Sequence, residues 1–97
     1  MVLLVARYYV KPGNVDAVIA ALETMAPLVA ATEPECSLYL ANRSQEDTNL
    51  ILLVERYTDM DAIAFHRETP HFKEIIEGTV VPLLEKRERD FYDTVVG

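Results

Sequence analysis

The sequence predicts an α+β fold built on one four-stranded sheet. Four segments are rich in β-branched and aromatic residues, which is typical of strands, and segments with apolar residues at helical spacing lie between them. The predicted order is strand, helix, strand, strand, two helices, strand. Four antiparallel strands with the helices packed on one face give the ferredoxin-like βαββααβ arrangement.

The N-terminal third predicts a strand, a turn and a long helix. Residues 2–10, VLLVARYYV, form the strand, and residues 11–14, KPGN, form the turn because proline fixes one φ angle and glycine permits the opposite sign. Asn14 is positioned to cap the helix that follows. Apolar residues at helical spacing run through residues 15–31, and Pro27 is expected to kink or end this helix because it removes one backbone hydrogen bond.

Two strands joined by a hairpin are predicted in the middle of the chain. Residues 32–35, TEPE, form a linker, and the strands occupy residues 36–42 and 50–57 on either side of a polar loop at residues 43–49. Cys36 is the only cysteine, which excludes an internal disulfide framework. We expect it to be a small core residue of a half-buried strand.

The C-terminal part predicts two helices and a last strand. A helix over residues 59–68 begins at Thr58-Asp59, because a short polar oxygen there can accept from the first free backbone N–H groups. Thr69-Pro70 predicts an N-cap followed by proline at the first position of a third helix. That helix carries its apolar residues within 72–84, and residues 89–96 are predicted to form the final strand.

Both faces of the predicted sheet are apolar, although the helices can cover only one. Alternate side chains of a strand point to opposite faces, and neither set is polar in residues 2–10 or 50–57. An uncovered face of this kind is too large an apolar patch for a monomer, and a second copy of the same sheet is the simplest cover. We therefore expect a homodimer, a dimeric α+β barrel, that buries one face: Leu3, Val5, Leu50, Leu52 and Val54.

Composition narrows the class of protein and its partners. The 97 residues are expected to form one domain, residues 1–97, around a single core. With 16 acidic and 9 basic residues the net charge is −7, which argues against a nucleic-acid partner because phosphate backbones need clustered Lys and Arg. We see no basic leader before the first strand and no apolar run long enough to span a membrane, so we expect a cytoplasmic protein without a membrane partner.

Chemistry is expected in residues 50–72, which contain both histidines and a carboxylate near the end of a strand. His66 is the candidate base, because an ordinary imidazole titrates near pH ~6.5. Glu55 is the carboxylate that could orient this ring or hold its charged form. The alternative is a structural hydrogen bond between the two side chains that fastens the helix to the sheet. The histidines are five residues apart across a helix break, which is not the spacing of a helical metal pair, so no metal site is expected.

Several motifs of the chain are similar to those of one family. They are Tyr9-Val10-Lys11-Pro12-Gly13, the segment from Glu33 to Tyr39, Glu55-Arg56-Tyr57-Thr58-Asp59, Ala62, His66 and Pro70-His71-Phe72. In these motifs, and over nearly its whole length, the chain resembles the antibiotic biosynthesis monooxygenase family, whose members are dimeric α+β barrels. The resemblance implies oxidation of a small phenolic or quinol substrate by O2, without flavin, metal or any other cofactor.

The resemblance leaves other functions open. A non-catalytic or small-ligand-binding module of the same fold is one of them, because fold alone does not give function. A small-molecule isomerase acting on a phosphorylated ketose is another, and the few basic residues expected near the pocket argue against it. The haem-degrading branch of the family has functional Asn, Trp and His side chains at positions that align with Ala6, His66 and Ile76, so no haem is expected.

A cofactor-free oxygenase needs a base and a dry pocket that accepts an aromatic ring. The expected catalytic residues are His66 and Glu55. Each expected pocket residue is also an ordinary candidate for the core or for a helix cap. The expected substrate-binding residues are Tyr8, Phe65, His71, Phe72 and Tyr92.

Overall fold

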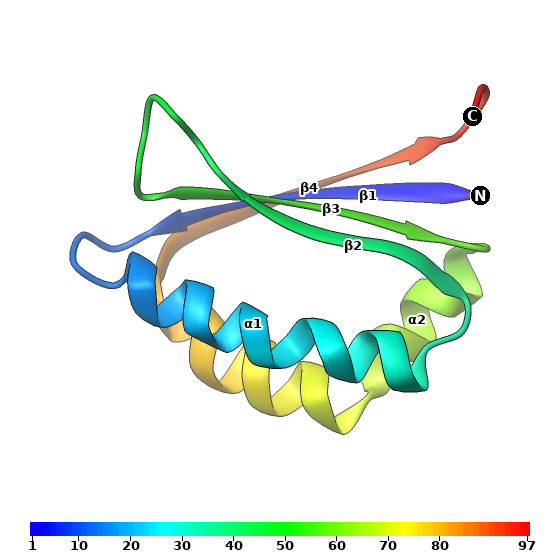
Figure 1. The fold of residues 1–97 in the computed structure, drawn as a ribbon, viewed down its shortest axis with the longest axis horizontal. Helices are drawn as coiled ribbons and strands as arrows, with labels where there is room; N and C mark the ends of the chain where they lie inside the picture. Colours follow the sequence, from blue (N-terminus) through cyan, green and yellow to red (C-terminus); the bar gives the residue numbers. More distant parts are fainter.

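The protein has two layers in the computed structural model, which describes residues 1–97. One layer is an antiparallel sheet with the strand order β2-β3-β1-β4. Its strands are β1 (Val2–Val10), β2 (Cys36–Arg43), β3 (Leu50–Tyr57) and β4 (Leu84–Asp93). Figure 1 shows the helices together on one face of this sheet: α1 (Val15–Thr32), α2 (Met60–Glu68) and the π-helical η1 (Phe72–Val80). The predicted ferredoxin-like α+β fold is confirmed.

Helix α1 continues beyond Pro27 and ends at Thr32. It does not end at the proline, because Met25 and Val29 on either side are buried in the core. Burial of two apolar side chains outweighs the loss of one backbone hydrogen bond. Asn14 occupies the N-cap position but makes no side-chain cap, because its amide donates to two carbonyl groups of the preceding turn. The predicted Asn14 cap is therefore wrong.

By length and composition α1 also resembles a membrane-crossing helix. Its 18 residues have a mean hydropathy of 1.5, so the expectation that no apolar stretch has this length is wrong. One stripe of the helix packs into the core beneath the sheet, as in a core helix of a globular protein. The buried residues of this stripe are Val18, Leu22, Met25 and Val29.

The last third of the chain differs most from expectation. The third helix, η1, ends at Val80 and is followed by a single 3-10 turn, η2 (Val81–Leu83). Pro82 lies in that turn and has no N–H group with which to extend a helix. Strand β4 begins at Leu84, whereas residues 89–96 were the predicted strand. The early part of β4 is rich in charged side chains, so its sequence does not show the apolar pattern that predicts a strand.

The core lies between the sheet and the helices, where the inward-facing residues of β1 and β3 meet α1 and η1. Each fully buried Val, Leu or Ile side chain contributes about 1.5–3 kcal/mol to folding. The central members of this cluster are Ala6, Val18, Met25, Leu53, Ile76 and Val80. A smaller cluster under α2 joins Leu4, Tyr57, Ala62 and Ile63.

The opposite face of the sheet has no helix over it (Figure 1). Its apolar side chains on β1 and β3 are only half-buried. They are Leu3, Val5, Leu50, Leu52 and Val54. The prediction that β1 and β3 are apolar on both faces is confirmed, whereas the outer face of β4 carries the charged residues Lys86, Glu88 and Asp90.

Candidate active site

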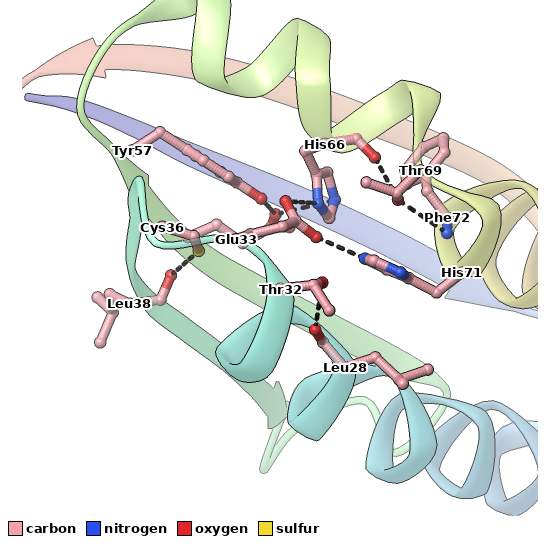
Figure 2. A network of polar contacts seen from close by, with 11 residues as sticks. Leu28, Thr32, Glu33, Cys36, Leu38, Tyr57, His66, Thr69, His71 and Phe72 are labelled. Atoms are coloured by element: carbon pink, nitrogen blue, oxygen red, sulfur yellow. Dashed lines mark hydrogen bonds and ion pairs between the residues drawn. The ribbon is translucent and has the colours of Figure 1, made fainter.

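One buried carboxylate, Glu33, joins both histidines of the chain. Glu33 directly follows α1 and is 3% exposed. The Nδ1 atom of His66, on α2, lies 2.7 Å from Glu33 Oε1, and the Nε2 atom of His71 lies 2.6 Å from Glu33 Oε2. Figure 2 shows the carboxylate between the two imidazole rings. The rings share one acceptor, and no group of three or more His, Cys, Asp or Glu side chains is placed to hold a metal ion.

Two caps fix the backbone around the histidines. The Asp59 carboxylate accepts the Ala62 N–H at 2.9 Å and begins α2, as predicted. The Thr69 hydroxyl donates to the His66 carbonyl at 2.7 Å and accepts the Phe72 N–H at 3.2 Å, so it ends one helix and begins the next. The predicted cap at Thr69 is confirmed. The break between the helices directs both rings to the same carboxylate.

Glu33 remains ionised because it accepts from both rings. Burial by itself raises the pKa of a carboxyl group, but the hydrogen bonds and the charge of His66 and His71 outweigh burial and hold the pKa of Glu33 below its ordinary value. A carboxylate can only accept, so His66 donates from Nδ1 and His71 from Nε2. The Nε2 atom of His66 is therefore the nitrogen that can accept a proton when the ring is neutral.

Glu55, on β3, lies beside this second nitrogen of His66. Its Oε1 atom is 3.7 Å from His66 Nε2, which is longer than a hydrogen bond, and accepts the Tyr57 hydroxyl at 2.5 Å. Burial raises the pKa of Glu55, and the hydrogen bond from Tyr57 offsets only part of that rise. The residue that orients His66 is Glu33, which the sequence assigned to a linker. Glu55 is close enough to stabilise positive charge on Nε2.

His66 borders a narrow void under the sheet. All four strands contribute inward-facing side chains to its wall, among them Ala6, Tyr39, Glu55 and Arg89. Its volume is about 10 Å³. A space of roughly 10–15 Å³ holds about one water molecule, whereas benzene occupies a cavity of roughly 150 Å³. An aromatic ring can therefore reach His66 only after side chains move.

Two larger hollows lie between α1 and β2. Their volumes are about 330 and 530 Å³, and Glu23, Ala26 and Tyr39 border both. Tyr39 also borders the void, and its ring centroid is 6.1 Å from that of His66. Tyr39 is thus the side chain that separates a space large enough for an aromatic ring from the imidazole.

The expected pocket residues fall in different places. Tyr8 and Phe72 border the void with His66. Phe65 is 58% exposed and borders a separate hollow of about 180 Å³ together with Glu33. The positions aligned with the functional residues of the haem-degrading branch all border the void. They are Ala6, His66 and Ile76.

Tyr92 and His71 do not line the void. Tyr92 pairs with Leu3 on the face away from the helices and is 51% exposed, so the prediction that it lines the helix-side pocket is wrong. The reason is the register between β4 and β1, which gives the inward position opposite Leu4 to Phe91. His71 is bound to Glu33 outside the void.

Three arginines that were not among the expected site residues border the void: Arg67 on α2, and Arg87 and Arg89 on β4. The expectation of few basic residues near the pocket is therefore wrong. The signal was the alternating charge of residues 86–90, KRERD. Because alternate strand residues face opposite sides, the two arginines of β4 face the helices and the acidic residues beside them face away.

These features define a class of protein, an α+β fold in which a buried histidine of a helix lies between two buried carboxylates on the helix-covered side of the sheet. The sequence matches the model of the family described as "antibiotic biosynthesis monooxygenase" over residues 1–78. The chain belongs to the antibiotic biosynthesis monooxygenase family. No curated protein matches it in sequence.

Solved structures share the fold along nearly the whole chain. A candidate antibiotic biosynthesis monooxygenase from Caulobacter crescentus has a TM-score of 0.91 at 26% identity, covering 98% of this chain and 90% of that one. A protein from Mycobacterium tuberculosis has a TM-score of 0.87 at 25% identity, with coverages of 99% and 96%. A candidate monooxygenase from Nitrosomonas europaea, at 22% identity, has a TM-score of 0.91 and coverages of 99% and 100%.

Proposed function

We propose that this protein is a cofactor-independent monooxygenase that oxidises a small phenolic or quinol substrate with O2. Family membership supports the class of reaction. One observation carries the choice of base: the ionised Glu33 accepts the Nδ1–H of His66 at 2.7 Å, which leaves Nε2 of that ring as a proton acceptor.

In the proposed reaction the substrate supplies all the electrons. His66 Nε2 accepts the proton of a ring hydroxyl, and the resulting oxyanion, which is richer in electrons, passes an electron to O2. One oxygen atom enters the ring and the other leaves as water, so a hydroquinone becomes a hydroxyquinone without an external reductant. Glu33 and Glu55, on either side of the imidazole, stabilise the imidazolium that forms.

Substrate binding in this proposal widens the void at His66. Tyr39 lies between the void and a neighbouring hollow of about 330 Å³. Movement of Tyr39 joins the two spaces and admits the ring. Tyr8 and Phe72 then contact the ring from the far side, because both border the void.

A binding module without catalysis is the second candidate. The observation that favours it is that no buried side-chain nitrogen or oxygen lacks a hydrogen-bond partner, so the histidine network is complete without a substrate. In this function Glu33 fastens the ends of three helices together, and the space between α1 and β2 holds the ligand.

We further propose that the protein is a cytoplasmic homodimer. The support for the dimer is the uncovered apolar face of the sheet, which a second copy would bury. The apolar side chains of that face are Leu3, Val5, Leu50, Leu52 and Val54.

Oxygen uptake over a panel of hydroquinones tests the oxygenase against the binding module. The purified protein, without added metal or flavin, should consume O2 faster than autoxidation and form hydroxyquinone mole for mole. Heat-denatured protein is the control, and catalase separates the reaction from autoxidation, which releases peroxide. Uptake at the uncatalysed rate for every substrate, with saturable binding by calorimetry, would favour the binding module.

A further inference from the structure

Three positive charges converge at the void beside His66. The chain has only 9 Lys and Arg residues and a net charge of −7. Arg67, Arg87 and Arg89 nevertheless border the same small space. Arg67 extends from α2 towards β4, where its guanidinium lies 6.0 Å from the centre of the Phe91 ring.

None of these three guanidinium groups has a carboxylate within ion-pair distance. Arg7 and Lys73, in contrast, are paired with a carboxylate, Arg7 with Asp90 at 2.9 Å and Lys73 with Glu68 at 3.1 Å. Glu88 and Asp90, the acidic residues next to Arg87 and Arg89 on β4, project from the other face of the sheet and cannot pair with these arginines. The three positive charges therefore face a single carboxylate at the void, that of Glu55, which pairs with none of them.

The neighbourhood of the cluster suits an anion. Burial, and then the charges of Arg67 and Arg87, lower the pKa of Arg89 against smaller opposing effects of Tyr8 and Glu55, so repulsion by the two other arginines acts on Arg89. A bound anion would relieve that repulsion. Arg89 is paired with Ala6, and both residues border the void. Burial, followed by the charge of Glu55, raises the pKa of Tyr8 to about 12, so its hydroxyl remains a donor.

We propose that Arg67, Arg87 and Arg89 bind an oxyanion, a carboxylate or phosphate group carried by the aromatic substrate. Guanidinium forks match both groups because they can donate two parallel hydrogen bonds. The ring of such a substrate extends under the sheet from β4 towards His66, with its hydroxyl at Nε2. The substrate assignment rests on the proposed function, whereas the anion site rests on the arginines alone. Family membership does not imply the site, because Arg87 and Arg89 lie outside the matched residues 1–78.

Calorimetric titration of the whole protein with three matched ligands tests this site. The ligands are hydroquinone, dihydroxybenzoate and hydroxyphenyl phosphate, which share a phenolic ring and differ in the anionic group. The anionic ligands should bind about 10- to 100-fold more tightly than hydroquinone, the range expected for a hydrogen bond to a charged group. The ligand with the larger gain identifies the group as carboxylate or phosphate.

An arginine variant tests whether the tighter binding of anionic ligands depends on the three arginines. Arg89→Gln should remove most of this difference, so that the variant binds the anionic ligands about as tightly as it binds hydroquinone. Lys73→Gln is the control, because Lys73 is an exposed cation that is paired with Glu68 and does not border the void. Arg89 is itself exposed, so its variant should fold, which circular dichroism will check.

Two results would overturn the anion site. One is equal affinity for neutral and anionic ligands. The other is a higher affinity for the anionic ligands that is still present in Arg89→Gln. Either would leave these arginines as charges that discourage pairing along an edge strand. Arginine-dependent binding of anions without any oxygen uptake would keep the site and refute the oxygenase. Turnover of neutral hydroquinones, without tighter binding of the anionic ligands, would keep the oxygenase and refute the anion site.

Discussion

Glu33 and Glu55 are equally buried, at 3% exposure, but their ionised forms have opposite effects on stability. Glu33 accepts from two imidazole rings, and its pKa is held below the ordinary value. Glu55 accepts from the hydroxyl of Tyr57, and burial raises its pKa. Folding therefore favours the carboxylate form of Glu33 and the protonated form of Glu55.

Substitution of the two carboxylates by glutamine should show this difference. At neutral pH Glu33→Gln should lower the free energy of unfolding by about 1.5–3 kcal/mol, the value of hydrogen bonds to a charged group. Glu55→Gln should leave it unchanged or raise it, because the amide can still accept from Tyr57 and no charge is buried. Urea unfolding of both variants and the wild type measures the difference, and equal destabilisation would contradict it.

The pH dependence has a definite sign for each group. The pKa of Glu33 is lowered on folding, so its stabilisation is present above the ordinary carboxyl pKa of roughly 4.3 and is lost as the pH falls through the folded-state value. The contribution of Glu55 is lost as the pH rises through its raised pKa. The difference in free energy of unfolding between the wild type and Glu33→Gln should therefore become smaller at acid pH. A difference that is constant with pH would show that Glu33 acts only through packing.

The sequence predicts some site residues and not others for physical reasons. The period of β3 places Glu55 on the helix side, and the cap at Asp59 places His66 in a helix. Glu33 belongs to a Thr-Glu-Pro-Glu segment whose composition is typical of an exposed loop, and its partner His66 is 33 residues away. Its burial depends on how α1 packs, which no local pattern reveals. The prediction for Tyr92 was wrong because the face on which it lies depends on the register between β4 and β1.

At the scale of elements, the junction between α2 and η1 depends on the hydroxyl of Thr69. Thr69→Ala should lower the free energy of unfolding by about 0.5–2 kcal/mol, because it removes the cap of the following helix and a bond to the His66 carbonyl. Thr24→Ala is the control, because the Thr24 hydroxyl bonds only a carbonyl of its own exposed helix face. Equal effects of both substitutions in thermal unfolding would show that the junction does not need this hydroxyl.

The order of elements follows from the sequence, whereas their ends depend on packing. Caps and turn residues act locally, so the beginnings of α2 and η1 are predictable. Helix α1 runs past Pro27 because of burial on both sides of it. Strand β4 begins at Leu84 because β1 offers a long edge to pair with, and its charged residues carry little strand signal of their own.

At the scale of the whole molecule, the uncovered sheet face should join two chains. Val54→Asp places a charge in the centre of that face and should convert the dimer to a monomer of 11.0 kDa. Leu28→Asp is the control, because Leu28 is 39% exposed on α1, away from the sheet face. Sedimentation at micromolar concentration measures both variants. Wild-type protein that sediments as a monomer would contradict the proposed assembly.

The central claim is that His66, and not merely an imidazole bound to Glu33, removes the substrate proton. His66→Gln and His71→Gln each remove one ring that donates to the same carboxylate, but only His66 borders the void. With a hydroquinone that the wild type turns over, oxygen uptake by His66→Gln should fall by about 10²–10⁴-fold, the usual effect of losing a positioned base. His71→Gln, with its fold verified, should stay within a few-fold of wild type, whereas equal losses in both variants, or none in His66→Gln, would contradict the account.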